Sequence, residues 1–242
     1  MHDNLMEWMS DVLAERYGER PLAVAVRRGY MSDTAAVELD GGRRVFKVFG
    51  RGAQGTVQVR FSLELQAFLG AKGYPTPKIV PALNGQPFVE KGDKVCALLE
   101  FVEGQLHTPG NVGQLVAAAR RLAEFHDLAS QFQPSEPLDW PPMAEAVFAA
   151  KRAELADVMA AAAKTEDPLL GFCDLRRVEG LLAQAEREFA HLPLPELPQR
   201  IIHGDYRAQN LLFAGDTVTA VLDFDFARPA QRLFDLAYAL VF

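Results

Sequence analysis

The pattern of apolar and polar positions predicts a helix followed by strands at the start of the chain. Residues 4–17 carry apolar side chains three and four positions apart, the spacing of one face of an amphipathic helix. Apolar residues then cluster or alternate at 22–26, 35–39 and 45–49, and Asp40-Gly41-Gly42 supplies turn residues between the last two runs. This part of the chain therefore predicts a meander of about three strands.

A second stretch completes the first hundred residues. Residues 57–69 place apolar side chains on one side of a helix, and the runs 79–83 and 87–90 flank an Asn84-Gly85 turn. Residues 95–102 form an apolar run of the kind found in buried strands. We expect these segments to form a five-stranded antiparallel sheet with one inserted helix.

Helical patterns dominate the rest of the chain. Residues 113–129 have the apolar spacing of a helix, with Asn111 as its N-cap, and Ala-rich amphipathic segments follow at about 143–164 and 171–191. A small β-rich part therefore precedes a larger helical part. This order predicts the α+β class.

We expect two lobes, an N-terminal one over 1–102 and a C-terminal one over 103–242, joined by a hinge at about 98–104. The chain stops inside the apolar run 236–242, where a domain normally ends in a polar tail. We therefore expect that the C-terminal lobe is truncated, that the chain is a minimal variant, or that a homodimer covers this apolar end.

Composition and charge narrow the class of protein. Of the 242 residues 49% are hydrophobic and 24% charged, an ordinary globular balance, and the net charge of -7 argues against nucleic acid or an anionic membrane as partner. The start of the chain lacks the apolar stretch of a signal peptide, and no apolar run reaches about 18 residues. Cys96 and Cys173 are too few for a disulfide framework. These features predict a cytoplasmic location.

The segment with the clearest chemistry lies near the C-terminal end. His203-Gly204-Asp205 opens a loop after an apolar pair, Asn210 follows Asp205 by five positions, and a short hairpin leads to Asp223. Phosphoryl transfer from ATP needs a carboxylate to orient an attacking hydroxyl and oxygen ligands for Mg²⁺. Asp205, Asn210 and Asp223 are of these types, and the hairpin would place the last two side by side.

The run HGDYRAQN, followed by VLDFD, resembles the catalytic and metal-binding segments of the aminoglycoside phosphotransferase and choline kinase-like family. The resemblance implies a protein kinase-like bilobal fold. Its N-terminal lobe, an antiparallel sheet plus a helix, would bind ATP, and its mainly helical C-terminal lobe would carry the catalytic hairpin and the acceptor site. By position, Asp205 resembles the catalytic base, and Asn210 and Asp223 resemble the Mg²⁺ ligands.

The same resemblance implies roles for four neighbouring residues. His203 would be a structural residue of the catalytic loop, and His126 a structural histidine of a family helix. Asp225 stands where protein kinases have the glycine of D-F-G and would give a further metal or water contact. Asp235 would tie the following helix to the catalytic loop.

Lys47 tests the same idea in the N-terminal lobe. It is a single lysine inside an apolar strand, where an unpaired ammonium is costly to bury, so it needs an anion. A kinase-like lobe uses such a lysine on the ATP phosphates and holds it with a helix glutamate. Glu64 is the expected partner and Glu90 the second choice. The alternatives are a solvent-facing Lys47 and a Glu64 on a solvated helix face.

Other residues are expected around the nucleotide. Gly29 and Ser32 occupy the place of the family's nucleotide-covering loop, although a plain hairpin turn explains them equally well. The segment 96–104 resembles the hinge, where backbone groups of Glu100 and Val102 would bind adenine. Leu212 and Leu222 would floor the adenine pocket, or they serve ordinary core packing.

These residues predict an ATP- and Mg²⁺-dependent phosphotransferase. Asp235 follows Asp223 by only twelve positions, which leaves no room for a long activation segment and favours a small-molecule hydroxyl acceptor over a protein. Aminoglycoside-, homoserine- and amino-alcohol-like acceptors all stay open. The alternatives are a catalytically impaired nucleotide-binding regulatory module and an atypical Ser/Thr protein kinase.

Overall fold

The computed structural model describes residues 2–28, 32–49, 56–92, 94–136, 139–164 and 174–241. The chain divides into two compact units. One consists of Met1–Leu138 together with Arg200–Phe242, and the other is Asp139–Gln199. The N-terminal sheet and the segment around Asp205 therefore belong to the same unit.

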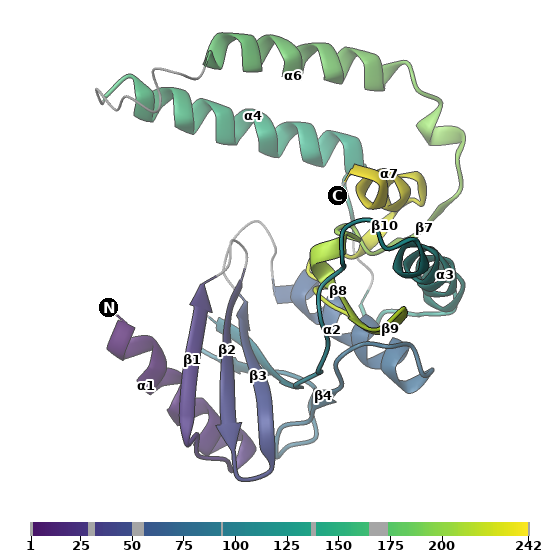
Figure 1. The fold of residues 1–242 in the computed structure, drawn as a ribbon. Helices are drawn as coiled ribbons and strands as arrows, with labels where there is room; N and C mark the ends of the chain where they lie inside the picture. The colour runs from purple at the N-terminus through teal and green to yellow at the C-terminus, as the bar shows by residue number, and fades with distance from the viewer. Residues whose placement is uncertain are drawn as a thin grey trace. The chain divides into compact units, whose positions relative to one another are not determined.

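An antiparallel sheet forms the first part of this unit (Figure 1). Its strands follow the order β1-β2-β3-β6-β4, and β5 also pairs with β6. The sheet therefore has six strands, one more than expected, because both runs that flank the Asn84-Gly85 turn contribute a short strand, β4 and β5, and each pairs with β6. The strands are β1 (Ala23–Arg28), β2 (Ser32–Leu39), β3 (Gly42–Phe49), β4 (Ile79–Val80), β5 (Val89–Lys91) and β6 (Lys94–Glu100).

Helix α1 (His2–Val12) and the π-helical turn η1 (Leu13–Tyr17) pack on one face of this sheet (Figure 1). Their apolar side chains join the buried Phe46 and Leu98, which are paired across β3 and β6. The predicted amphipathic helix is thus confirmed. Because successive strand residues point to opposite faces, Lys47 lies on the other face.

Helix α2 (Thr56–Ala71) packs on that other face. Its Val59 and Leu63, one helical turn apart, form a core cluster with Phe49, Val95 and Ala97 of the sheet. Helix α3 (Val112–Ala129) follows, and the Asn111 side chain accepts a hydrogen bond from the backbone N–H of Gln114, as its predicted N-cap role requires.

The C-terminal part of this unit is built from short elements. Strand β7 (Gln199–Ile202) pairs with β10 (Arg228–Gln231), and β8 (Leu211–Ala214) forms a hairpin with β9 (Thr217–Val221). This is the hairpin predicted between Asn210 and Asp223. A 3-10 turn, η3 (Ala208–Asn210), precedes β8, and helix α7 (Leu233–Val241) ends the described chain.

The second unit is a pair of helices, α4 (Met143–Ala162) and α6 (Leu175–Ala190), followed by the 3-10 turn η2 (Leu194–Glu196) (Figure 1). Phe148 and Phe189 pack edge to face, with ring centroids 5.3 Å apart, and Arg152 forms an ion pair with Glu186. Both helices were expected from the Ala-rich pattern.

The observed elements confirm the α+β class. The boundary at 102/103 stays a prediction, as does the homodimer at the C-terminal end. Cys96 is buried as a free thiol, and Cys173 lies outside the described residues. Among the described helices, we find none with the length and apolar content needed to cross a membrane.

Candidate active site

The loop that follows β7 is held by one buried carboxylate. Asp235, at the start of α7, accepts the backbone N–H of His203 at Oδ2 and that of Gly204 at Oδ1, each at 2.8 Å. Its side chain is completely buried, and Oδ2 also contacts Nε2 of His126 at 2.8 Å. The structure thereby confirms the tie between this helix and the loop, and His126 is buried and hydrogen-bonded as a structural histidine.

The His203 ring is buried beneath this loop. Its Nδ1 accepts the backbone N–H of Asp205 at 3.3 Å, so the proton sits on Nε2, which donates to the Leu222 carbonyl at 3.1 Å. Burial lowers the pKa of His203 and outweighs the neighbouring carboxylates, which raise it. A neutral ring with both nitrogens engaged supports the loop and is not placed to transfer protons.

Both oxygens of the Asp205 carboxylate have partners. Asn210 donates from Nδ2 to Oδ2 at 2.7 Å and to the Asp205 carbonyl at 2.9 Å, and Arg207 Nε lies 3.0 Å from Oδ1. Burial raises the pKa of Asp205, and the Asn210 hydrogen bond and the Arg207 charge only partly offset this. Asp205 is thus an oriented carboxylate with a raised pKa, as a general base requires.

The hairpin connects Asn210 to Asp223. The backbone N–H of Leu222, directly before Asp223, donates to the Asn210 carbonyl at 2.8 Å. Nδ2 of Asn210 is directed at Asp205, so Oδ1 is the side-chain atom of Asn210 that would serve a cation. Asp223 has a φ of 66°, uncommon for a residue other than glycine, and its side chain is 40% exposed.

These two side chains fit a hard divalent cation in ligand type. Mg²⁺ prefers oxygen ligands, and usually combines one or two protein carboxylates with waters and substrate phosphates. Among the described residues no group of three or more His, Cys, Asp or Glu could hold a metal ion. A cation here would therefore take Asn210 and Asp223 and complete its shell with phosphate oxygens and water.

Lys47 reaches this cluster from β3. Its Nζ lies 3.0 Å from Oδ1 of Asp223 and 2.6 Å from Oδ1 of Asp225. Burial lowers the pKa of Lys47, but the Asp225 and Asp223 charges outweigh it and leave the pKa raised. At Asp223 burial acts to raise the pKa, but the Lys47 ammonium outweighs burial, so the pKa is lowered. At Asp225 burial outweighs the Lys47 ammonium, so the pKa is raised.

The predicted ion pair between Lys47 and Glu64 is corrected by the structure. Glu64 accepts hydrogen bonds from the backbone N–H and the hydroxyl of Ser135, at 3.1 and 2.6 Å. The physical reason is helical geometry. Val59 and Leu63 are the residues of α2 that face the sheet, and Glu64 is rotated about 100° from Leu63 around the helix axis. Glu90, the second choice, pairs with Arg60.

The residues expected around the adenine are partly brought together. Gln105 and Phe213 exchange backbone hydrogen bonds of 2.9 and 2.8 Å, so the chain after β6 runs along β8. A Cβ on Gly104 would lie 2.8 Å from Cβ of Leu212, which shows how closely the two segments approach. The backbone N–H of Glu100 already donates to the Lys78 carbonyl, so only the Glu100 carbonyl is left as its adenine contact.

The other expected nucleotide contacts are less direct. Val102 lies between β6 and this crossing, and Leu222 lies beside Asn210 through its backbone bond. Ser32, the first residue of β2, hydrogen-bonds to the Asp225 carboxylate. Gly29 lies outside the described residues. The nucleotide-binding roles of these residues remain predictions.

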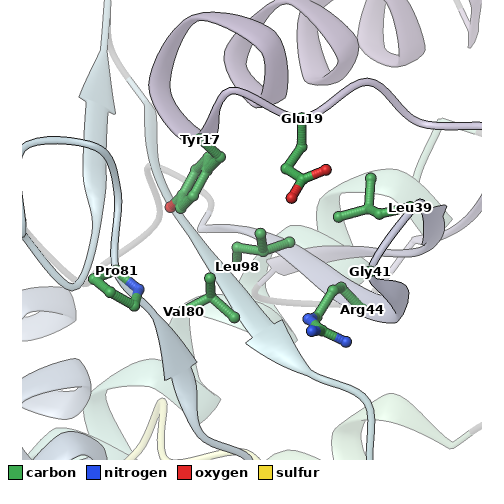
Figure 2. Close-up of a pocket in the computed structure, with 8 residues that line it drawn as sticks. All are labelled: Tyr17, Glu19, Leu39, Gly41, Arg44, Val80, Pro81 and Leu98. Carbon is green, nitrogen blue, oxygen red and sulfur yellow. The ribbon is translucent and has the colours of Figure 1, made fainter.

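A small cavity lies on the face of the N-terminal sheet opposite to Lys47 (Figure 2). Its volume is about 80 Å³, far below the roughly 300 Å³ at which ligand pockets begin. Leu98, one of its lining residues, lies on the face of the sheet that α1 covers, whereas Lys47 lies on the face that α2 covers. The cavity is therefore separate from the candidate site. Its lining residues are Tyr17, Glu19, Leu39, Gly41, Arg44, Val80, Pro81 and Leu98.

Two site residues have contacts that sequence reasoning missed. Arg207 contacts Asp205, and only its place two positions after the proposed base hinted at this. Asp225 was expected as a metal or water contact, whereas in the structure it is the carboxylate closer to Lys47 Nζ. The signal was present, because a buried carboxylate and a buried ammonium each need a counter-charge.

Comparisons with known proteins show which family this chain resembles. The model of the phosphotransferase enzyme family, APH, matches residues 23–242. A homoserine kinase of Afipia carboxidovorans is 27% identical over 185 residues, which cover 74% of this chain and 51% of that protein. The chain therefore spans about half the length of the homoserine kinases it matches.

Solved structures are similar in fold. The amicoumacin kinase hAmiN, in complex with AMP-PNP, Ca²⁺ and Ami, has a TM-score of 0.68 at 14% identity, over 99% of this chain and 71% of that one. A microcompartment-associated aminopropanol kinase has a TM-score of 0.60 at 17% identity, over 97% and 74%. These similarities confirm the predicted protein kinase-like fold class.

Proposed function

The chain belongs to the phosphotransferase enzyme family, and we propose that it transfers the γ-phosphate of ATP to a hydroxyl group of a small molecule. The observation that carries this proposal is the connected network of Asp205, Asn210, Asp223 and Lys47 within one compact unit. A carboxylate base, oxygen ligands for a divalent cation and a buried ammonium are the groups that such a transfer uses.

Asp205 acts as the base in this proposal. It orients the acceptor hydroxyl and takes up its proton, while the hydroxyl oxygen forms a bond to the γ-phosphorus and the bond from that phosphorus to the leaving ADP oxygen breaks. The Asn210 hydrogen bonds fix the carboxylate relative to the backbone. Its function is therefore mainly to position the acceptor for in-line attack.

Asn210 and Asp223 are the proposed ligands of Mg²⁺, which supplies positive charge to the phosphate oxygens when bound. Lys47 adds a second positive charge on the α- and β-phosphates. The adenine would contact the Glu100 carbonyl and the Val102 backbone, with Leu212 and Leu222 beneath it. The crossing of the chain at Gly104 over β8 supports this position.

The acceptor belongs to the amino-bearing small alcohols in this proposal. The similar proteins are named for homoserine, amicoumacin and aminopropanol, and another similar structure is that of an aminoglycoside phosphotransferase. Arg207 places a guanidinium 3.0 Å from the proposed base, which favours an acceptor with an anionic group near its hydroxyl. Homoserine, which carries a carboxylate, is therefore the first acceptor to test.

ADP release with ATP and Mg²⁺ tests the proposal against a panel of homoserine, homoserinol, 1-amino-2-propanol and kanamycin. We expect acceptor-dependent ADP release with one of them and its loss in Asp205→Asn. Homoserinol lacks the carboxylate of homoserine, so the ratio of their rates tests the Arg207 argument separately.

Other outcomes would assign the chain differently. Nucleotide binding without release of ADP on any acceptor would favour the impaired nucleotide-binding module. Phosphate incorporation into a generic protein substrate would favour an atypical Ser/Thr protein kinase. An Asp205→Asn variant with unchanged turnover on the true acceptor would contradict the role of Asp205.

A further inference from the structure

We infer that Asp225, and not a glutamate of helix α2, is the positioning residue that holds Lys47 for the nucleotide phosphates. This inference deepens the proposed function and depends on it. It assigns to the third residue of Asp223-Phe224-Asp225 a task distinct from metal binding.

The contact between Lys47 and Asp225 is the shorter and more buried of the two that Lys47 makes to carboxylates. Nζ lies 2.6 Å from Asp225 and 3.0 Å from Asp223, and the Asp225 side chain is 5% exposed against 40% for Asp223. A charge-assisted hydrogen bond of this length is among the strong ones in proteins. Lys47 therefore has its firmest anchor at Asp225.

Asp225 is itself fixed from the sheet. Ser32 of β2 hydrogen-bonds to its carboxylate, and Ser32 is paired with Phe49, two positions after Lys47 on β3. The carboxylate is thus held by side chains from two neighbouring strands. A group fixed in this way keeps its position when ligands exchange around it.

Asp223 suits the other task. Its carboxylate is accessible, and it is connected to Asn210 through the backbone bond of Leu222. A cation that takes Asp223 competes with Lys47 for that carboxylate. Lys47 then needs a second carboxylate that stays paired with it while the cation is bound, and Asp225 is that carboxylate.

Glu64 is engaged elsewhere, by the backbone N–H and hydroxyl of Ser135. Two hydrogen bonds to one carboxylate hold it in place, and Lys47 has its own two partners. Glu64 therefore serves as a matched control, because it is the glutamate that a kinase-like lobe would use.

The experiment is a pair of double-mutant cycles on the affinity for AMP-PNP with Mg²⁺, measured by calorimetry on the full chain. The variants are Lys47→Met, Asp225→Asn, Glu64→Gln and the two doubles that include Lys47→Met. We expect Asp225→Asn to weaken binding by about 10- to 100-fold, as for loss of a hydrogen bond between charged groups, and Glu64→Gln to stay within about twofold.

The doubles separate positioning from general damage. Lys47→Met/Asp225→Asn should bind no more weakly than Lys47→Met alone, because both changes remove the same interaction. In steady-state kinetics, Asp225→Asn should raise KM for ATP and leave KM for the acceptor unchanged, a split that a loss of fold would not produce. Thermal unfolding of each variant verifies folding at the assay temperature.

Ser32→Ala covers the case in which Asp225→Asn does not fold, since it removes one hydrogen bond and no charge. It should weaken nucleotide binding in the same direction by about two- to tenfold. Wild-type affinity in Ser32→Ala and Asp225→Asn, or a large loss in Glu64→Gln, would overturn the inference while leaving the proposed function intact. A wild-type chain that does not bind the nucleotide would overturn the proposed function itself.

Discussion

His126 and Asp235 lie 109 positions apart in the chain, and Nε2 of the first contacts Oδ2 of the second at 2.8 Å with both side chains buried. The same carboxylate accepts the backbone N–H groups of His203 and Gly204. One side chain thus joins α3, α7 and the loop that carries the proposed base. These hydrogen bonds hold the loop in position without a bound ligand.

Substitution of Asp235 by asparagine should therefore destabilise the protein. The amide NH₂ replaces an acceptor with a donor facing backbone N–H groups, which leaves buried donors unsatisfied. We expect a loss of about 3 kcal/mol in the free energy of unfolding, measured by urea denaturation. Asp11→Asn, an exposed position on α1, is the matched control and should stay within about 0.5 kcal/mol. Equal losses would refute the role of Asp235.

Gly204 should tolerate no side chain. Its φ is +79°, and a Cβ would lie 2.3 Å from the Phe226 carbonyl oxygen, a clash with backbone. Gly73 has nearly the same φ, +83°, with nothing within 4 Å of a Cβ, so Gly73→Ala measures the conformational strain alone. We expect Gly204→Ala to lose about 1–3 kcal/mol more than Gly73→Ala. Similar unfolding free energies for the two variants would show that the loop moves away from Phe226.

Local pattern explains which parts of this site were predictable. The hairpin between Asn210 and Asp223 follows from two apolar runs around a Gly215-Asp216 turn, and its formation brings these side chains together. Lys47 was identified because a lone lysine in an apolar strand needs a counter-charge. Each of these sequence patterns spans only a few neighbouring residues, so it can be recognised without knowledge of the tertiary fold.

The partner of Lys47 was not predictable in the same way. Glu64 and Asp225 both carry the right charge, and the choice depends on the rotation of α2 over the sheet and on the chain direction at Asp223. The positive φ of Asp223 belongs to a region that residues other than glycine rarely adopt, so no pattern announces it. Arg207 was missed for a related reason, since the direction of its side chain is set by the loop.

Arg207 should set the acidic limit of activity. Its charge lowers the pKa of Asp205, against the larger effect of burial, which raises it. Only the ionised carboxylate accepts the hydroxyl proton, so kcat/KM should fall as the pH drops through that pKa. In Arg207→Gln the pKa rises further, and the acidic limb should move to higher pH.

The control for this prediction is Arg207→Lys, which keeps the positive charge and should keep the limb near its wild-type position. The measurement is kcat/KM against pH for all three proteins with the acceptor found in the panel. A limb that stays in place in Arg207→Gln would show that the guanidinium does not act on Asp205 in solution.

His203 should make stability depend on pH. Burial lowers the pKa of its ring below the ordinary 6.5, so between these two values the unfolded chain binds a proton that the folded protein does not. The free energy of unfolding should therefore decrease as the pH falls below 6.5, by at most about 1.4 kcal/mol per pH unit. Asp205 and Asp225, whose pKa values are raised, contribute in the opposite direction.

Comparison with His203→Gln isolates this contribution, because the two carboxylates are present in both proteins. The glutamine amide can still donate to the Leu222 carbonyl, and urea denaturation between pH 5 and pH 7 should show a smaller decrease in the variant. An NMR titration of the His203 ring gives the same answer without a substitution. A ring that gains its proton at or above pH 6.5 would contradict the buried neutral state, and with it the structural role of His203 beneath the loop.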